Sequence, residues 1–239
     1  MNWSKFSSLF HESWHPKIKP FIESKECDDI YAFLKKESTR GKKIAPLSSD
    51  VFRAFLETPY DEIKVVMIGM CPYHTTKNGM YVADGLLMGC SRTETLQPSL
   101  EQFYNALERE FYDGLNLKYI KTPDVSYLAH QGVLMLNAAL TTELNKAGSH
   151  IQLWEPFTKY LIEEVLSLTQ APFIFLGKDA ARYIKYTNPF VPSFVLSHPA
   201  SASYKNTEWD SEGAFKKVNK MLKDNNGWEI NWLYEESPF

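Results

Sequence analysis

Residues 64–74 read Lys-Val-Val-Met-Ile-Gly-Met-Cys-Pro-Tyr-His, an apolar run that passes at once into a glycine and a proline-containing polar segment. Lys64–Ile68 is too short for a buried helix and contains β-branched residues, so it predicts a buried strand. Gly69 lets the backbone turn tightly where that strand ends. The stretch therefore predicts a strand that leads directly into a sharply turning loop.

The same alternation of short apolar runs and helical segments extends along the chain. Further strands are predicted at Leu86–Met88, Val133–Leu136, Phe173–Leu176 and Phe194–Leu196. Helical spacing is found at Cys27–Lys36, Asp50–Glu57, Ser99–Phe111, Glu155–Leu168, Asp179–Tyr186 and Glu212–Lys223. Strands alternating with helices predict right-handed βαβ units. We therefore expect a single α/β domain over residues 1–239, a three-layer α/β/α fold around a mostly parallel sheet of four to five strands.

Composition limits the class of protein. Of 239 residues, 44% are hydrophobic and 23% charged, which is typical of a globular chain. The net charge of -3 gives no global positive field, so any DNA-binding surface has to be local. Three cysteines without a CxxC pair indicate neither a disulfide framework nor a zinc site. Without a recognisable signal peptide or membrane span, a soluble intracellular protein of the cytoplasm or nucleus is expected.

In parallel sheets, ligands bind beyond the carboxyl ends of the strands. The segments that follow predicted strands are Gly69–His74, the loop after Met88, Asn137–Thr142 and Ser197–Ser203. These four segments are therefore expected to hold the functional site.

Five collinear motifs lie in or beside these segments: Gly69–His74, Gln97–Leu100, Gly132–Thr141, Ser149–Thr158 and His198–Ser203. Together they resemble the family-1 uracil-DNA glycosylases, whose water-activating loop reads GQDPYH and whose minor-groove loop reads HPSPLS. The resemblance spans roughly residues 44–222. It implies a monomeric DNA-repair hydrolase, without cofactor or metal, that flips uracil out of DNA and cleaves its N-glycosidic bond.

The resemblance also assigns roles to residues around the flipped base. It places Met70, Tyr73, Met88 and Asn137 in the base-binding pocket. The Asn137 amide offers both a donor and an acceptor to the pyrimidine edge, although a strand-end Asn also caps turns. The Tyr73 ring would fill the space beside C5 and reject thymine. His198 would stabilise negative charge on uracil O2 during bond cleavage.

Cys71 is the largest departure from the family, because it stands where the family has its catalytic aspartate. An ordinary thiol, with a pKa of about 8.5, is mostly neutral at pH 7. Loss of one electrostatic group such as the family's carboxylate costs on the order of 10²–10³ in rate, which predicts a slower enzyme rather than an inactive one. A pKa lowered by the neighbouring His74 would partly restore a negative charge.

Two further departures concern the base and the duplex. Met88 replaces a phenylalanine that stacks on uracil, and a core methionine is an equally good interpretation. The DNA-binding residues implied by the family motifs are Pro98, Ser99, Ser201, Ala202, Ser203 and Lys205. Ala202 lies near the family's leucine wedge and cannot fill the gap left by a flipped base. Single-stranded DNA is therefore the favoured substrate.

The sequence leaves three functions open. The first is a glycosylase for uracil or a related pyrimidine, attenuated at Cys71. The second is an inactive homologue that acts as a DNA-binding or replication-associated protein. The third is a glycosylase retuned to a modified base. The aromatic segment Trp228–Phe239 fits either packing on the domain or contact with a partner.

Overall fold

The central sheet consists of four parallel strands in a computed structural model that describes residues 3–112 and 119–235. The strands are β2 (Val65–Gly69), β6 (Val133–Asn137), β8 (Phe173–Leu176) and β9 (Ser193–Leu196), in the order β6-β2-β8-β9. β2, β6 and β8 are buried along their whole length. Such continuous burial is typical of parallel strands that helices cover on both faces.

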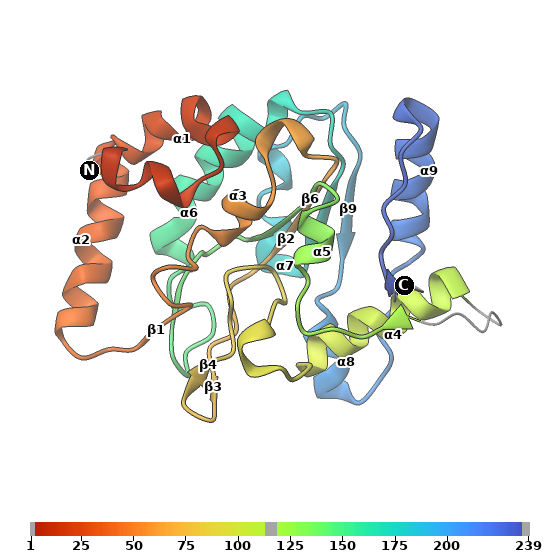
Figure 1. The fold of residues 1–239 in the computed structure, drawn as a ribbon, viewed down its shortest axis with the longest axis horizontal. Coiled ribbons are helices and arrows are strands. Elements are labelled where there is room, and N and C mark those ends of the chain that lie inside the picture. Colours follow the sequence, from red (N-terminus) through yellow and green to blue (C-terminus); the bar gives the residue numbers. More distant parts are fainter. Residues whose placement is uncertain (1–2, 113–118, 236–239) are drawn as a thin grey trace.

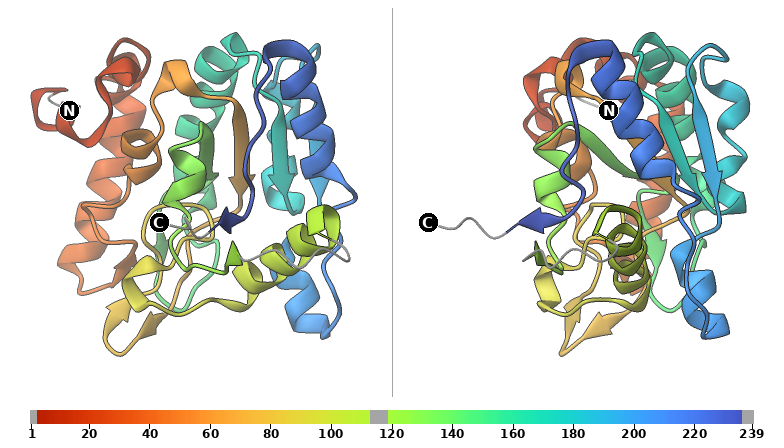
Figure 2. Two further views of the ribbon diagram at one scale, coloured as in Figure 1. Left: turned by 45° about the vertical axis from the view of Figure 1, so that its right-hand side comes forward. Right: turned by 90° about the vertical axis from the view of Figure 1, so that its right-hand side faces the viewer.

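Helices flank the sheet on either side (Figures 1 and 2). α1 (His15–Ile22), α2 (Lys25–Thr39) and α6 (Ile151–Tyr160) lie together on one side, and α2 packs against both of the others. α9 (Ala214–Asn226) lies on the opposite side. The predicted three-layer α/β/α fold with a mostly parallel sheet is confirmed.

The remaining elements are short, apart from α4. The helices are α3 (Arg53–Glu57), α4 (Pro98–Tyr112), α5 (Ser126–Ala129), α7 (Lys178–Ala181) and α8 (Pro199–Lys205). Antiparallel pairs join β1 (Ile44–Ala45) to β7 (Thr142–Glu143), β3 (Thr76–Lys77) to β4 (Met80–Tyr81), and β5 (Tyr119–Ile120) to β10 (Tyr234–Glu235). Single 3-10 turns occupy Trp3–Lys5, Ser7–Leu9, Glu12–Trp14, Tyr60–Glu62, Ser91–Thr93, Leu166–Leu168 and Ile184–Tyr186.

Each segment with helical spacing contains a helix, with shifted ends. The segment predicted at Glu155–Leu168 begins earlier, at Ile151, and passes through a π-helical turn at Leu161–Val165. The segment predicted at Asp179–Tyr186 divides into α7 and a 3-10 turn. Helix periodicity in the sequence thus located the helices but not their irregular ends.

The strand predicted at Leu86–Met88 is wrong. Leu87 N–H donates to the Met135 carbonyl of β6 at 3.1 Å, but no ladder forms beyond that bond. The segment winds instead around the buried carboxylate of Asp84, which accepts hydrogen bonds from Leu86 N–H and from Ser91 N–H, both at 3.1 Å. Apolar side chains here are buried because the loop wraps inward.

The Asp84 carboxylate is therefore expected to hold the loop that carries Met88. It also forms an ion pair with the Arg53 guanidinium at 3.0 Å. Asp84→Asn should lower the free energy of unfolding by about 2–3 kcal/mol, because hydrogen bonds to a buried charge are lost. Urea unfolding measures this, with the exposed Asp61→Asn as a charge-matched control. Equal stability of the two variants would remove Asp84 from this role.

The C-terminal aromatic segment packs on the domain through Trp232. Trp232 is buried and its indole N–H donates to Asn219 Oδ1 at 3.0 Å. Its ring lies against Phe215, with centroids 4.7 Å apart. Phe239 lies outside the described residues. Packing on the domain therefore holds for Trp232, whereas Trp228 and Tyr234 are exposed, and partner contact stays an open alternative.

Sheet register brings the loops after all four strands to one edge. Gly69 of β2 is paired with Asn137 of β6, and Leu176 of β8 with Leu196 of β9. The carboxyl ends consequently lie level, with α4 and α8 packed together at the same end of the molecule (Figure 2).

That the full span 1–239 forms one domain stays a prediction. Within residues 3–112 and 119–235, no helix has the length and apolar character to cross a membrane.

Candidate active site

Cys71 lies two residues beyond the end of β2, with its thiol largely enclosed. Gly148 N–H donates to Cys71 Sγ at 3.3 Å. Burial, with a smaller contribution from the Asp179 carboxylate, raises the pKa of the Cys71 thiol to about 11. The idea that His74 lowers this pKa is therefore wrong, since desolvation of the thiolate dominates. Cys71 is a neutral thiol at physiological pH.

The Gly148 loop that contacts Cys71 is held by a buried polar chain. The Trp154 indole N–H donates to Thr141 Oγ1 at 2.7 Å. Thr141 Oγ1 also lies 2.9 Å from His150 Nδ1, within hydrogen-bond distance. Burial lowers the pKa of His150, so the imidazole is neutral. This chain fixes the start of α6 and thereby the donor to Cys71.

Asn137 is the last residue of β6 and its side chain is only 4% exposed. Among the described residues, none forms a hydrogen bond with its amide group. A side chain on Gly69 would place its Cβ 3.3 Å from Asn137 Oδ1 and 2.4 Å from Leu87 Cδ1, so the glycine leaves room for the amide. Buried amides normally have partners, and an unpartnered one indicates a place for a ligand.

Tyr73 is fixed by the first turn of α4. Its hydroxyl lies 2.6 Å from Ser99 Oγ, and burial raises the pKa of the phenol well above its ordinary value. Ser99 is itself buried, whereas Pro98 beside it is exposed. The structure thus links Ser99 to Tyr73, and the contact of Pro98 and Ser99 with DNA stays a prediction.

Met88 is buried in a left-handed backbone conformation, with φ of 59°. Such a φ is uncommon outside glycine. It persists where surrounding contacts hold the backbone in place, and here the loop around Asp84 does so. Met70 is half-buried, and its carbonyl accepts from Ala139 N–H at 3.0 Å. Both methionines border the loops that hold Cys71 and Asn137. Their contact with a base stays a prediction.

His198 follows β9 and caps the N-terminus of α8. Ala200 N–H donates to His198 Nδ1 at 3.1 Å, so the ring proton of the neutral imidazole lies on Nε2. Burial lowers the pKa of His198, which favours this neutral form. The ring is therefore prepared to act as a neutral hydrogen-bond donor through Nε2.

The residues of the predicted minor-groove loop form α8 and its cap. Ser201 Oγ donates to the His198 carbonyl at 2.7 Å, and Ser203 Oγ donates to the Pro98 carbonyl at 3.1 Å. Ala202 is buried against the core, whereas Lys205 is exposed. The two serine side chains thus brace the helix, and the contact of Ser201, Ala202, Ser203 and Lys205 with DNA stays a prediction.

Two features at the carboxyl edge were missed from the sequence. The loop after β8 carries Gly177 and Asp179, and it was not among the segments singled out, although its strand was predicted. Gly148 was missed because a backbone donor leaves no side-chain signal. His74 Nδ1 is buried without a hydrogen-bond partner among the described residues. Only the end of a predicted strand at Leu176 could have directed attention to the Gly177 loop.

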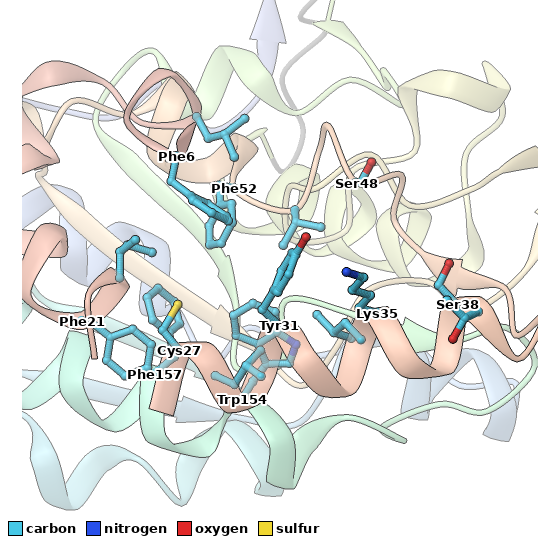
Figure 3. Close-up of a pocket in the computed structure, with 16 residues that line it drawn as sticks. Phe6, Phe21, Cys27, Tyr31, Lys35, Ser38, Ser48, Phe52, Trp154 and Phe157 are labelled. Atoms are coloured by element: carbon cyan, nitrogen blue, oxygen red, sulfur yellow. The ribbon is translucent and has the colours of Figure 1, made fainter. Parts of the chain in front are cut away.

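An apolar cavity of about 330 Å³ lies elsewhere, between α2 and the core (Figure 3). Tyr31, Phe52 and Trp154 line it, and the Cys27 sulfur lies at one end. Its few polar groups, such as Lys35 and Ser48, do not include the unpartnered amide or the prepared imidazole of the carboxyl edge. The carboxyl edge of the sheet is therefore the candidate active site, and this cavity is not part of it.

Comparison with known proteins identifies the family of the chain. A family model for the uracil DNA glycosylase superfamily matches residues 56–223. A uracil-DNA glycosylase of Streptococcus pneumoniae (strain Hungary19A-6) is 34% identical over 226 residues, which make up 93% of this chain and 99% of that protein. The chain belongs to the uracil-DNA glycosylase superfamily.

Solved structures of the superfamily share the fold. The crystal structure of mimivirus uracil-DNA glycosylase has a TM-score of 0.81 at 24% identity, covering 95% of this chain and 88% of that one. The wild-type UNG of Nitratifractor salsuginis has a TM-score of 0.68 at 17% identity, covering 99% of both chains. At these identities the two structures bear on the fold alone, and they agree with the α/β/α architecture.

Proposed function

We propose that this uracil-DNA glycosylase homologue hydrolyses the N-glycosidic bond of uracil in DNA. The observation that carries the proposal is the Asn137 amide, which is almost fully buried and has no partner among the described residues. An amide of this kind can donate to uracil O4 and accept from uracil N3–H. His198 lies after the strand at the other end of the sheet order, so the two groups flank the loop that carries Cys71.

The reaction needs little covalent help from the protein. The C1′–N1 bond breaks with both electrons leaving on uracil, whose negative charge spreads to O2. A neutral imidazole that donates from Nε2 stabilises that charge without having to reorganise. Tyr73, pinned by Ser99, fills space beside the loop and supports discrimination against a C5 methyl group. A water molecule then adds to the cationic sugar.

Cys71 weakens the stabilisation of the cationic sugar and the positioning of the attacking water. The buried neutral thiol carries no negative charge to stabilise the cationic sugar and is a poor acceptor from water. One missing electrostatic group costs on the order of 10²–10³ in rate, whereas enzymes supply about 8–23 kcal/mol in total. We therefore propose a slow glycosylase and not an inactive one.

The surface near α8 supports DNA as the partner, in single-stranded form. With Ala202 buried, this helix has no apolar wedge at that position to hold a duplex open. Tyr204 is 85% exposed and lies next to Lys205, an arrangement suited to stacking on an unpaired base beside a phosphate.

We propose that the protein acts as a monomer.

An excision assay tests this function and its strand preference. Matched single-stranded and duplex oligonucleotides carry one uracil, one thymine or one cytosine, and alkaline cleavage scores abasic sites. We expect slow release of uracil alone, faster from the single strand. Equal release of thymine would contradict the role of Tyr73, and preference for the duplex would contradict the role assigned to Ala202.

The raised pKa of Cys71 also favours a second candidate, a homologue that binds DNA without cleaving it. For such a protein, uracil-containing single strands would bind more tightly than thymine-containing ones, yet no abasic sites would form. Fluorescence anisotropy run beside the excision assay separates the two functions.

A further inference from the structure

The loop after β8 is placed among the predicted catalytic residues. Gly177 has φ of +90°, and a Cβ there would lie 3.2 Å from His198 Cβ, so the loop runs directly beside the imidazole. α7 begins at the next residue and packs against β2, the strand that leads to Cys71. Asp179, in the first turn of α7, thus follows a loop that lies beside His198 and belongs to a helix that packs against β2.

Asp179 differs from the other carboxylates near this edge. Its side chain is partly buried, and among the described residues none forms a hydrogen bond or an ion pair with it. Asp84, by contrast, is engaged by Arg53 and Ser91, and Glu143 is engaged by Lys146 at 2.7 Å. The charge of Asp179 also reaches the Cys71 thiol, where it disfavours the thiolate. A free carboxylate close to the reacting site is thus available.

We propose that Asp179 supplies part of the negative charge that Cys71 lacks during hydrolysis of the N-glycosidic bond. This inference rests on the proposed glycosylase function and assigns a further catalytic residue to it. A carboxylate beside a developing cationic sugar lowers the barrier electrostatically, and it accepts a hydrogen bond from the attacking water.

In the proposed hydrolysis, Asp179 is the only charged side chain that takes part. The C1′–N1 bond breaks and its electron pair leaves with uracil, while the sugar becomes an oxocarbenium ion. Water oxygen bonds to C1′, and one water proton passes to the Asp179 carboxylate and then to solvent. Uracil takes up a proton from solvent at N1. The products are free uracil and an abasic sugar, with no oxidant or cofactor required.

Paired substitutions at the two positions test this role under single-turnover conditions. Asp179→Asn should slow uracil release from single-stranded DNA by about 10²-fold in the wild-type background. In a Cys71→Asp background the same change should have less than about a threefold effect or should speed the reaction, because two adjacent carboxylates disfavour each other's ionisation. Asp61→Asn removes an equal, exposed charge before β2 and serves as the control.

A purely structural role for Asp179 would slow both backgrounds alike, and that result would overturn the proposal. Wild-type activity that is unchanged in Asp179→Asn contradicts the role of Asp179 alone. A wild type without any uracil release contradicts the proposed function and, with it, compensation by Asp179.

Discussion

Cys71→Asp is expected to raise the single-turnover rate of uracil release by about 10²–10³, which corresponds to about 3–4 kcal/mol of transition-state stabilisation. The buried thiol is neutral, with its pKa raised to about 11, so it offers no charge to a cationic sugar. A carboxylate at the same position adds that charge, and Gly148 N–H can donate to it as it now donates to sulfur. Rapid-quench assays on a single-stranded oligonucleotide measure the gain.

Cys71→Ser and Cys71→Ala serve as controls for the gain. Both lack a charge, so both should stay within about tenfold of the wild type. A large loss in Cys71→Ala would show that the thiol itself takes part in the reaction. Because Asp179 lies near, the new carboxylate should have a raised pKa, and the gain should be largest at neutral to alkaline pH. An Asp variant no faster than Ser would contradict the charge argument.

His198→Ala is expected to slow uracil release by about 10²–10³, because removal of one preorganised donor to an oxyanion has an effect of this size. The Ala200 N–H bond to Nδ1 fixes the tautomer that donates from Nε2. The comparison with His198→Gln is informative, since that side chain can also donate and should recover part of the rate. Full activity in His198→Ala would exclude the residue from catalysis.

The pH dependence of stability follows from the same group. Burial lowers the pKa of His198 in the folded protein below its ordinary value of about 6.5. The stability contributed by the neutral imidazole is therefore fully present above about pH 6.5 and is lost as the pH falls towards the folded-state pKa. Urea unfolding between pH 7.5 and 5 should show a decline that is smaller in His198→Ala.

Much of the fold could be predicted from local sequence patterns. Runs such as Val133–Leu136 and Phe173–Leu176 are short, apolar and bounded by turn residues, and they do form the sheet. Leu86–Met88 has the same appearance but is buried for another reason, because a loop folds around the Asp84 carboxylate. Apolar patterning reports burial, and a single hydrogen bond to β6 does not make a strand.

The site could be predicted only where a motif carried it. Asn137 and His198 were located by resemblance; the structure adds the burial of the Asn137 amide and the capping bond of His198, and their roles stay predictions. The order of the strands, which brings the β8 loop and Asp179 beside β2, depends on long-range pairing that no local pattern encodes. The direction of the Cys71 pKa depended on burial, which the neighbouring His74 in the sequence could not reveal.

The central claim is that the pocket still releases uracil although Cys71 carries no charge. The most direct measurement is release of radiolabelled uracil from single-stranded DNA by the wild-type protein, purified from a host without its own uracil-DNA glycosylase. Asn137→Ala and Cys71→Asp are assayed beside it. The account predicts slow release by the wild type, none by Asn137→Ala and fast release by Cys71→Asp. No release by the wild type, or equal release by Asn137→Ala, would contradict it.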